Sequence, residues 1–118
     1  MYRGPLLSVV VALFFVGPVP RANAEPGVFY FNGNELWDFC RVDSPNLGCV
    51  NYVSAIADAM TADHEGVMGW HACFRLNTTR GQIADVVKLW LQKHPEKRDL
   101  AAPGLVAQAL AQAFPCPS

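Results

Sequence analysis

The four cysteines constrain the fold of this 118-residue chain more than any other feature. They are Cys40, Cys49, Cys73 and Cys116. An even number of cysteines in a short exported chain indicates a disulfide framework, because a small domain buries too little surface to be stable without cross-links. The role of the cysteines therefore depends on whether the chain is exported from the cytoplasm. The N-terminal residues bear on that question.

The first 24 residues have the pattern of a secretory signal peptide. A positive charge precedes an apolar run over residues 6–16, and the sequence ANA at 22–24 fits a cleavage site. The run is shorter than the roughly 20 residues of a membrane-spanning helix. We therefore expect a signal peptide over residues 1–24, a single mature domain over residues 25–118, and no stable membrane anchor after cleavage.

The charge and motif content argues against several classes of function. Removing Arg3 and Arg21 with the signal peptide leaves 7 basic and 10 acidic residues, a net charge of −3. The mature chain therefore has no basic patch for nucleic acid. It also lacks a nucleophile–base constellation. We expect no enzymatic activity, no cofactor and no nucleic-acid partner.

Hydrophobic periodicity predicts a small all-α domain of four helices. Asn32 and Glu35 form a capping box at the start of the first helix, and Thr79 and Gln82 form another at the start of the third. Apolar residues then recur at helical spacing in each segment. The predicted helices cover residues 31–40, about 47–61, 79–94 and about 102–114.

The helix order favours one of the three disulfide connectivities. Cys40 ends the first helix and Cys49 begins the second across a short turn. Cys73 precedes the third helix and Cys116 follows the fourth. The short connection EKRD (96–99) predicts that these two helices pack antiparallel, which would bring the two cysteines together. We therefore expect the pairs Cys40–Cys49 and Cys73–Cys116.

The cysteines have two alternative uses, in a metal site or as a reactive thiol. His64 and His71 lie near Cys73 in the sequence. A zinc site needs thiolates at compact spacing, and a nucleophilic cysteine needs a partnered base and must stay reduced. The exported compartment argues against both uses, so we expect structural disulfides and no metal.

The segment 63–77, DHEGVMGWHACFRLN, is the candidate functional site. Irregular segments of this length are uncommon without a role. Met68, Trp70 and His71 are candidate contacts for a protein partner, because aromatic residues and methionine are enriched at interfaces. The alternative is that Trp70 folds onto the core.

The outer face of the third helix is a second candidate surface. Lys88 and Leu89 lie away from the apolar stripe of that helix, where they could contact a partner or a second copy of the chain. The alternative is an ordinary solvated face, since a single exposed leucine is unremarkable. Trp90 lies on the stripe and is expected in the core, and His94 suits the helix C-terminus.

Four sequence blocks and the spacing of the cysteines point to a known family. The blocks are FNGNELWDFC (31–40), CVNYVSAIAD (49–58), GQIADVVKLWLQKHPE (81–96) and LVAQALAQAFPC (105–116), with Cys73 nine residues before Gln82. In this order they resemble the Rap/Tai family of immunity proteins from bacterial type VI secretion systems. One difference is CFRLNTT (73–79), which has no proline shortly after the third cysteine.

The resemblance implies a helical, disulfide-bonded periplasmic protein. Members of this kind bind a peptidoglycan-cleaving amidase effector and inhibit it by blocking its active site, often as homodimers. The residues leave a second hypothesis open, a periplasmic stress protein that opens at acid pH and acts as a chaperone. Three histidines and the acidic net charge are compatible with that alternative.

Overall fold

A computed structural model describes residues 4, 10–18, 31–42 and 47–118 of the chain. No strand occurs within these ranges, so the predicted all-α fold of four helices is confirmed. The helices are α1 (Gly33–Cys40), α2 (Leu47–Ala62), α3 (Arg80–Lys93) and α4 (Ala102–Ala113), with a short 3-10 helix, η1 (Pro95–Lys97), between α3 and α4.

The N-terminal region contributes no described helix. Residues 10–18 have no regular secondary structure. Within the described ranges, no helix is both long enough and apolar enough to cross a membrane. The cleavage site expected after residue 24 lies outside the described residues, so the signal peptide and the domain boundary stay predictions.

Both predicted capping boxes are present. The Asn32 side chain accepts a hydrogen bond from the Glu35 amide at 3.0 Å, and the Glu35 carboxylate accepts one from the Asn32 amide at 2.9 Å. Thr79 and Gln82 make the same pair of bonds at the start of α3, at 3.1 and 2.8 Å. Each box satisfies amides that the first turn of a helix leaves unpaired.

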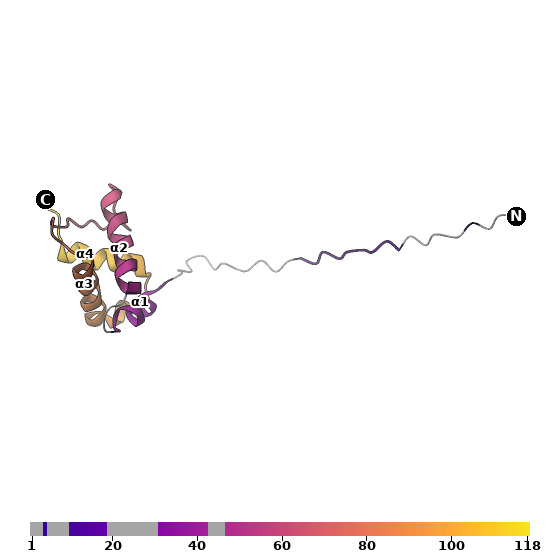
Figure 1. Ribbon diagram of the computed structural model, residues 1–118, viewed down its shortest axis with the longest axis horizontal. Helices are drawn as coiled ribbons and strands as arrows, with labels where there is room; N and C mark the ends of the chain where they lie inside the picture. The colour runs from indigo at the N-terminus through magenta and orange to yellow at the C-terminus, as the bar shows by residue number, and fades with distance from the viewer. Residues whose placement is uncertain (1–3, 5–9, 19–30, 43–46) are drawn as a thin grey trace.

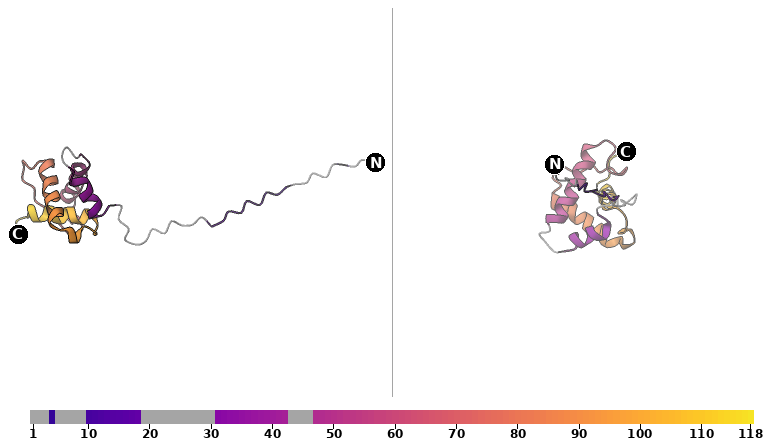
Figure 2. Two further views of the ribbon diagram at one scale, coloured as in Figure 1. Left: turned by 90° about the horizontal axis from the view of Figure 1, so that it is seen from below. Right: turned by 90° about the vertical axis from the view of Figure 1, so that its right-hand side faces the viewer.

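The helices pack around one hydrophobic core. Figures 1 and 2 show α2 beside α3, with α4 lying across them. The prediction that α3 and α4 pack antiparallel is wrong, because α4 crosses α3 in Figure 1. The connection between them is more than a short turn, since it contains η1, and Arg98 and Leu100, which follow η1, bind the start of α1 and redirect the chain. The largest fully buried side chains are Leu36, Val53, Val87, Leu91, Val106 and Leu110.

The buried stripes of α2 and α3 differ slightly from the predicted ones. In α2 the buried residue of the third turn is Ala57, and Ile56 is only half-buried. In α3, Ala84 is buried and Val86 is half-buried. Alanines at these positions allow helices to approach closely, whereas the larger neighbours cover the edge of the contact.

The start of α1 is bound by the segment that precedes α4. The Gly33 amide donates to the Leu100 carbonyl oxygen at 2.9 Å, and the Asn34 amide donates to the Arg98 carbonyl oxygen at 2.7 Å. The Ala102 amide donates in return to the Phe31 carbonyl oxygen at 3.1 Å. These bonds satisfy amides that α1 leaves free and fix where α4 begins.

Arg98, in the segment that precedes α4, joins α3 to α1 at this corner. Its Nε donates to the Leu91 carbonyl oxygen at 2.8 Å, near the end of α3. Its guanidinium carbon lies 4.4 Å from the centre of the Trp37 ring of α1. A cation beside the last carbonyls of a helix is favourable, so Arg98 caps α3 while it packs against α1.

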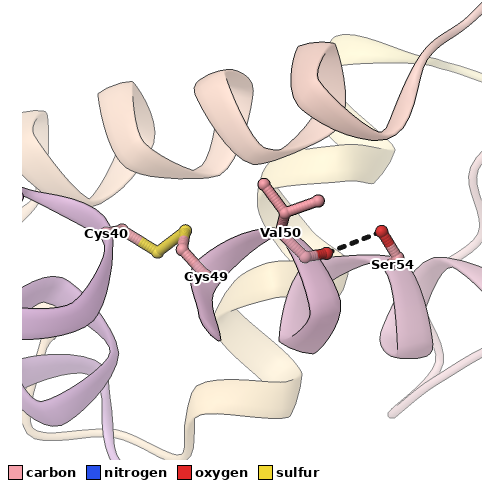
Figure 3. The surroundings of a disulfide bond; sticks show 4 residues. All are labelled: Cys40, Cys49, Val50 and Ser54. Carbon is pink, nitrogen blue, oxygen red and sulfur yellow. Dashed lines mark hydrogen bonds between the residues drawn. A yellow bond between two sulfur atoms is a disulfide. The ribbon is translucent and has the colours of Figure 1, made fainter. Parts of the chain in front are cut away.

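Both predicted disulfides are present. Figure 3 shows Cys40–Cys49 where α1 ends and α2 begins, next to the bond from Ser54 Oγ to the Val50 carbonyl oxygen (2.6 Å) within α2. The second disulfide, Cys73–Cys116, joins the segment before α3 to the segment after α4. The first pair is buried in the core, and the second is exposed to solvent.

Candidate partner-binding site

The segment between α2 and α3 contains a tight turn at Val67–Trp70. The Val67 amide donates to the Trp70 carbonyl oxygen at 3.1 Å, and the Trp70 amide donates to the Val67 carbonyl oxygen at 2.9 Å. Met68 and Gly69, the central residues, have φ values of 51° and 81°. Two positive φ values in succession are typical of a type I′ turn. The irregular segment is therefore an ordered hairpin turn at this point.

Met68 is held at the tip of this turn in a backbone conformation that favours glycine. Its side chain lies over α4 at Gly104, where an added Cβ would be 2.9 Å from the Met68 Sδ and 3.3 Å from its Cε. The methionine nevertheless remains 67% exposed. Gly104 thus provides the space for Met68 to rest on α4 while most of its surface faces solvent.

Trp70 lies beside Met68, and its side chain is neither buried in the core nor fully exposed to solvent. It is 37% exposed. With Met68, Leu100, Gly104 and Gln108 it lines a shallow recess of about 260 Å³ at the start of α4. Part of the indole is therefore covered by the protein, and part is available to a partner.

His71, the third predicted contact of the loop, is exposed and packs beside Gly66. An added Cβ on Gly66 would be 3.0 Å from the His71 Nδ1 and would overlap the Trp70 carbonyl oxygen. Gly66 has a φ of 70°, so both its conformation and its space favour glycine. This position brings His71 close to the turn that carries Met68 and Trp70.

The C-terminal end of the loop is fixed to the end of α4. Ala72 is buried, and the Cys73 amide donates to the Phe114 carbonyl oxygen at 2.8 Å. The Phe74 and Phe114 rings pack with their centres 5.1 Å apart. Together with the Cys73–Cys116 disulfide, these contacts hold the loop at one end, and α2 holds it at the other.

The structure places Leu89 and Lys88 apart from the loop. Leu89 is 50% exposed and lines a second recess, of about 290 Å³, with Trp90 and Gln112. Lys88 is half-buried, which differs from the fully outward position expected for it. The Trp90 Nε1 donates to the Gln112 Oε1 at 2.9 Å, and both residues line this recess.

The two recesses open beside one strip of α4. Gly104 and Gln108 border the first recess, and Gln112 borders the second. These residues are four apart, on successive turns of one face. Eight residues of helix span about 12 Å, so the loop contacts and Leu89 can belong to one continuous surface without touching.

A comparison with protein families decides what kind of protein carries this surface. A family model for Rap1a immunity proteins matches residues 32–116. The chain belongs to the Rap1a immunity protein family. The match includes the four helices, the four cysteines and the segment 63–77, and it confirms the family resemblance noted in the sequence. Searches of curated proteins and of solved structures found no significant match.

Membership of the Rap1a family makes this chain an immunity protein, with a protein effector as its partner. Immunity proteins of this kind generally act by binding rather than by catalysis. In the described part of the chain, no group of three or more His, Cys, Asp or Glu side chains could hold a metal ion. The described cysteines are all disulfide-bonded.

This Rap1a domain also has a groove that was not predicted from the sequence. The groove, of about 690 Å³, lies between α2 and the start of α3. Arg80 donates to the Asn51 Oδ1 at 2.6 Å and to the Ser54 Oγ at 3.1 Å across it, and Asp58 also lines it. The sequence feature that could have predicted this groove is the polar face of α2, where Asn51, Ser54 and Asp58 recur at helical spacing. This face lies opposite the capped start of α3. Because the Arg80 bonds join α2 to α3, the polar residues of the groove have a structural role, and we assign them no binding role.

Burial raises the pKa of the Tyr52 phenol. Tyr52 belongs to an aromatic cluster of this Rap1a domain in which its ring centre lies 5.5 Å from that of Phe31, and the centres of Phe31 and Phe39 are 5.3 Å apart. Partial burial of the ring removes water from the phenol and so disfavours its charged form. This cluster covers the contact between α1 and α2.

Proposed function

We propose that this protein is a periplasmic immunity protein that binds a peptidoglycan-cleaving amidase effector and occludes its active site. Membership of the Rap1a family supports an immunity role. The signal-peptide pattern supports export to the periplasm. The exposed surface of Met68, Trp70 and His71 supports binding through the loop.

The positive φ of Met68 is the observation that carries the assignment of the binding surface. A left-handed conformation costs a residue with a side chain about 1–2 kcal/mol. Such strain persists where the surrounding structure fixes it, and it is found preferentially at binding sites. Here it presents an exposed methionine next to a half-covered tryptophan. The turn is already ordered, so little conformational entropy is lost when a partner binds.

The recess at Leu89 is the proposed accessory or dimer surface. It is lined by apolar atoms of Val86, Trp90 and Ala109 in addition to Leu89. A homodimer formed through this recess would leave the Met68 turn free, because the two recesses lie about two turns apart along α4. Both the homodimer and the effector contact would then use neighbouring parts of one face.

An inhibition assay tests the proposed function. The protein purified after export is mixed with each amidase encoded near its gene, and the release of peptidoglycan fragments is measured as the protein is titrated. We expect one amidase to lose activity at a stoichiometric ratio. Failure to inhibit or bind any of them would contradict the proposal. Protection of client proteins from aggregation at acid pH would then favour the chaperone alternative.

A further inference from the structure

The two disulfides of this domain differ sharply in their access to solvent. Cys40 and Cys49 are 3% and 4% exposed and belong to the hydrophobic core. Cys73 and Cys116 are both exposed. Thiol–disulfide exchange requires a thiolate to reach a sulfur atom directly, so its rate depends on access. The folded protein therefore offers one disulfide to an attacking thiol and shields the other.

On the Cys116 side of the exposed disulfide, few other contacts hold the chain. The Phe114 amide still bonds within α4, to the Leu110 carbonyl oxygen at 2.8 Å. No described hydrogen bond holds residues 115–118 after it. Pro115 and Pro117 flank Cys116 and have no amide hydrogen to donate. Opening the disulfide therefore frees residues 115–118 without breaking a helix.

We propose that Cys73–Cys116 is a thiol–disulfide exchange site for a dithiol, open in the folded protein, and that its oxidation state controls the effector-binding loop. One thiolate of the dithiol attacks a sulfur of the pair, forming a mixed disulfide and releasing the other cysteine as a thiolate. The second thiol of the dithiol attacks the mixed disulfide and releases the second cysteine. Two electrons pass to the protein, the dithiol becomes a disulfide, and the cysteine thiolates take protons from water.

The fold survives this reduction. Core residues of α4, among them Leu105, Val106 and Leu110, stay buried, and the Cys40–Cys49 bridge stays closed inside the core. The loop keeps the hydrogen bond from Cys73 to Phe114 and the contact between Phe74 and Phe114. It loses its covalent clamp, so the turn at Met68 and Trp70 is held less firmly.

This regulation rests on the proposed function, since it acts on the same loop. A chain in which Cys73 and Cys116 have not yet been oxidised would carry an unclamped loop and bind its effector weakly. Oxidation after export would complete the binding surface. We expect reduction of Cys73–Cys116 to weaken effector binding by about tenfold, the scale of reordering one or two loop side chains on binding.

Alkylation mapping tests the exchange site without any effector. The exported, oxidised protein is treated with dithiothreitol in native buffer, quenched with iodoacetamide at intervals and mapped by mass spectrometry. We expect Cys73 and Cys116 to be alkylated at least roughly tenfold faster than Cys40 and Cys49, which become accessible only by larger-scale unfolding. In guanidinium chloride all four cysteines should react. Circular dichroism should show unchanged helix content in the singly reduced protein.

Two outcomes would overturn the exchange site. One is equal rates for both pairs in native buffer, and the other is loss of helix as Cys73–Cys116 opens. The double variant C73S/C116S serves as a control, because it should release almost no alkylatable thiol in native buffer. Effector affinity of the reduced protein is measured separately. Selective alkylation with unchanged affinity would retain the exchange site and refute its control of the loop.

Discussion

Gly33 lies where α1 makes a close backbone contact with the segment before α4. An added Cβ would be 2.5 Å from the Leu105 Cδ1, 2.7 Å from the Arg98 Cα and 2.8 Å from the Arg98 carbonyl oxygen. Two of these atoms belong to backbone and cannot rotate away. Glycine therefore allows the close approach that brings the free amides of α1 to the carbonyls before α4.

We predict that Gly33→Ala lowers the free energy of unfolding by about 2 kcal/mol, the scale of overpacking in a close-packed site. Gly81→Ala is the matched control, because the nearest atom to its Cβ is the Thr79 Oγ1 at 3.9 Å, and it should be neutral or stabilising by about 0.5–1 kcal/mol. Urea unfolding of both variants measures the difference. Equal midpoints would contradict the close contact at Gly33.

The positions of some single residues could be predicted from the sequence, whereas the contacts of others could not. Trp90 was predicted in the core and His94 at the end of α3, and both predictions are confirmed. The His94 ring stacks on Trp90, with ring centres 4.1 Å apart. The role of Arg98 could not be predicted, because its bond to the Leu91 carbonyl and its contact with Trp37 depend on how three elements meet.

At the scale of elements, the start of α3 depends on its capping box. We predict that Thr79→Ala lowers the free energy of unfolding by about 1 kcal/mol, because the Gln82 amide loses the acceptor that it binds at 3.1 Å. Thr79→Ser keeps the hydroxyl and should retain nearly all of the stability. Thermal unfolding of the two variants decides the matter, and an equal loss in both would show that the threonine methyl group, rather than the cap, is important.

The turn at Val67–Trp70 allows backbone strain to be separated from side-chain contact. Met68→Gly removes the left-handed strain and should leave stability unchanged or raise it by up to about 1 kcal/mol, while weakening effector binding. Gly69→Ala adds a side chain at a φ of 81°, with no atom within 4 Å of its Cβ, and should destabilise by about 1 kcal/mol. Urea unfolding measures both. If Met68→Gly destabilises as much as Gly69→Ala, packing of Met68 on Gly104 holds the turn instead.

The elements themselves were largely predictable, but their arrangement was only partly so. Capping boxes and apolar periodicity fix the helices locally, which is why their bounds were predicted to within a few residues. The crossing of α4 over α3 depends on hydrogen bonds between the start of α1 and residues 98–100, which no local pattern reveals. The hairpin turn was missed because a methionine at positive φ is uncommon.

At the scale of the whole molecule, the two disulfides stabilise different parts of the fold. Cys40–Cys49 is buried in the core where α1 ends and α2 begins, and Cys73–Cys116 links the segment before α3 to the segment after α4. The Cys40–Cys49 pair was predictable because helix order places these two cysteines at neighbouring ends. The Cys73–Cys116 pair is also as predicted, although the antiparallel packing of α3 and α4 on which that prediction rested is not observed. The predicted contacts Met68 and Trp70 are brought together at one recess, whereas Leu89 lies at another.

The central claim is that the loop at Trp70 binds the effector, and calorimetric titration of the amidase with Trp70→Ala tests it most directly. Leu47→Ala is the control, since Leu47 is exposed and is the first residue of α2, whereas the loop follows the last residue of that helix. We predict that Trp70→Ala keeps its helix content by circular dichroism and binds about 2 kcal/mol more weakly, roughly 30-fold, while Leu47→Ala binds normally. Unchanged affinity of a folded Trp70→Ala protein would contradict the claim, and loss of folding would show that Trp70 belongs to the core.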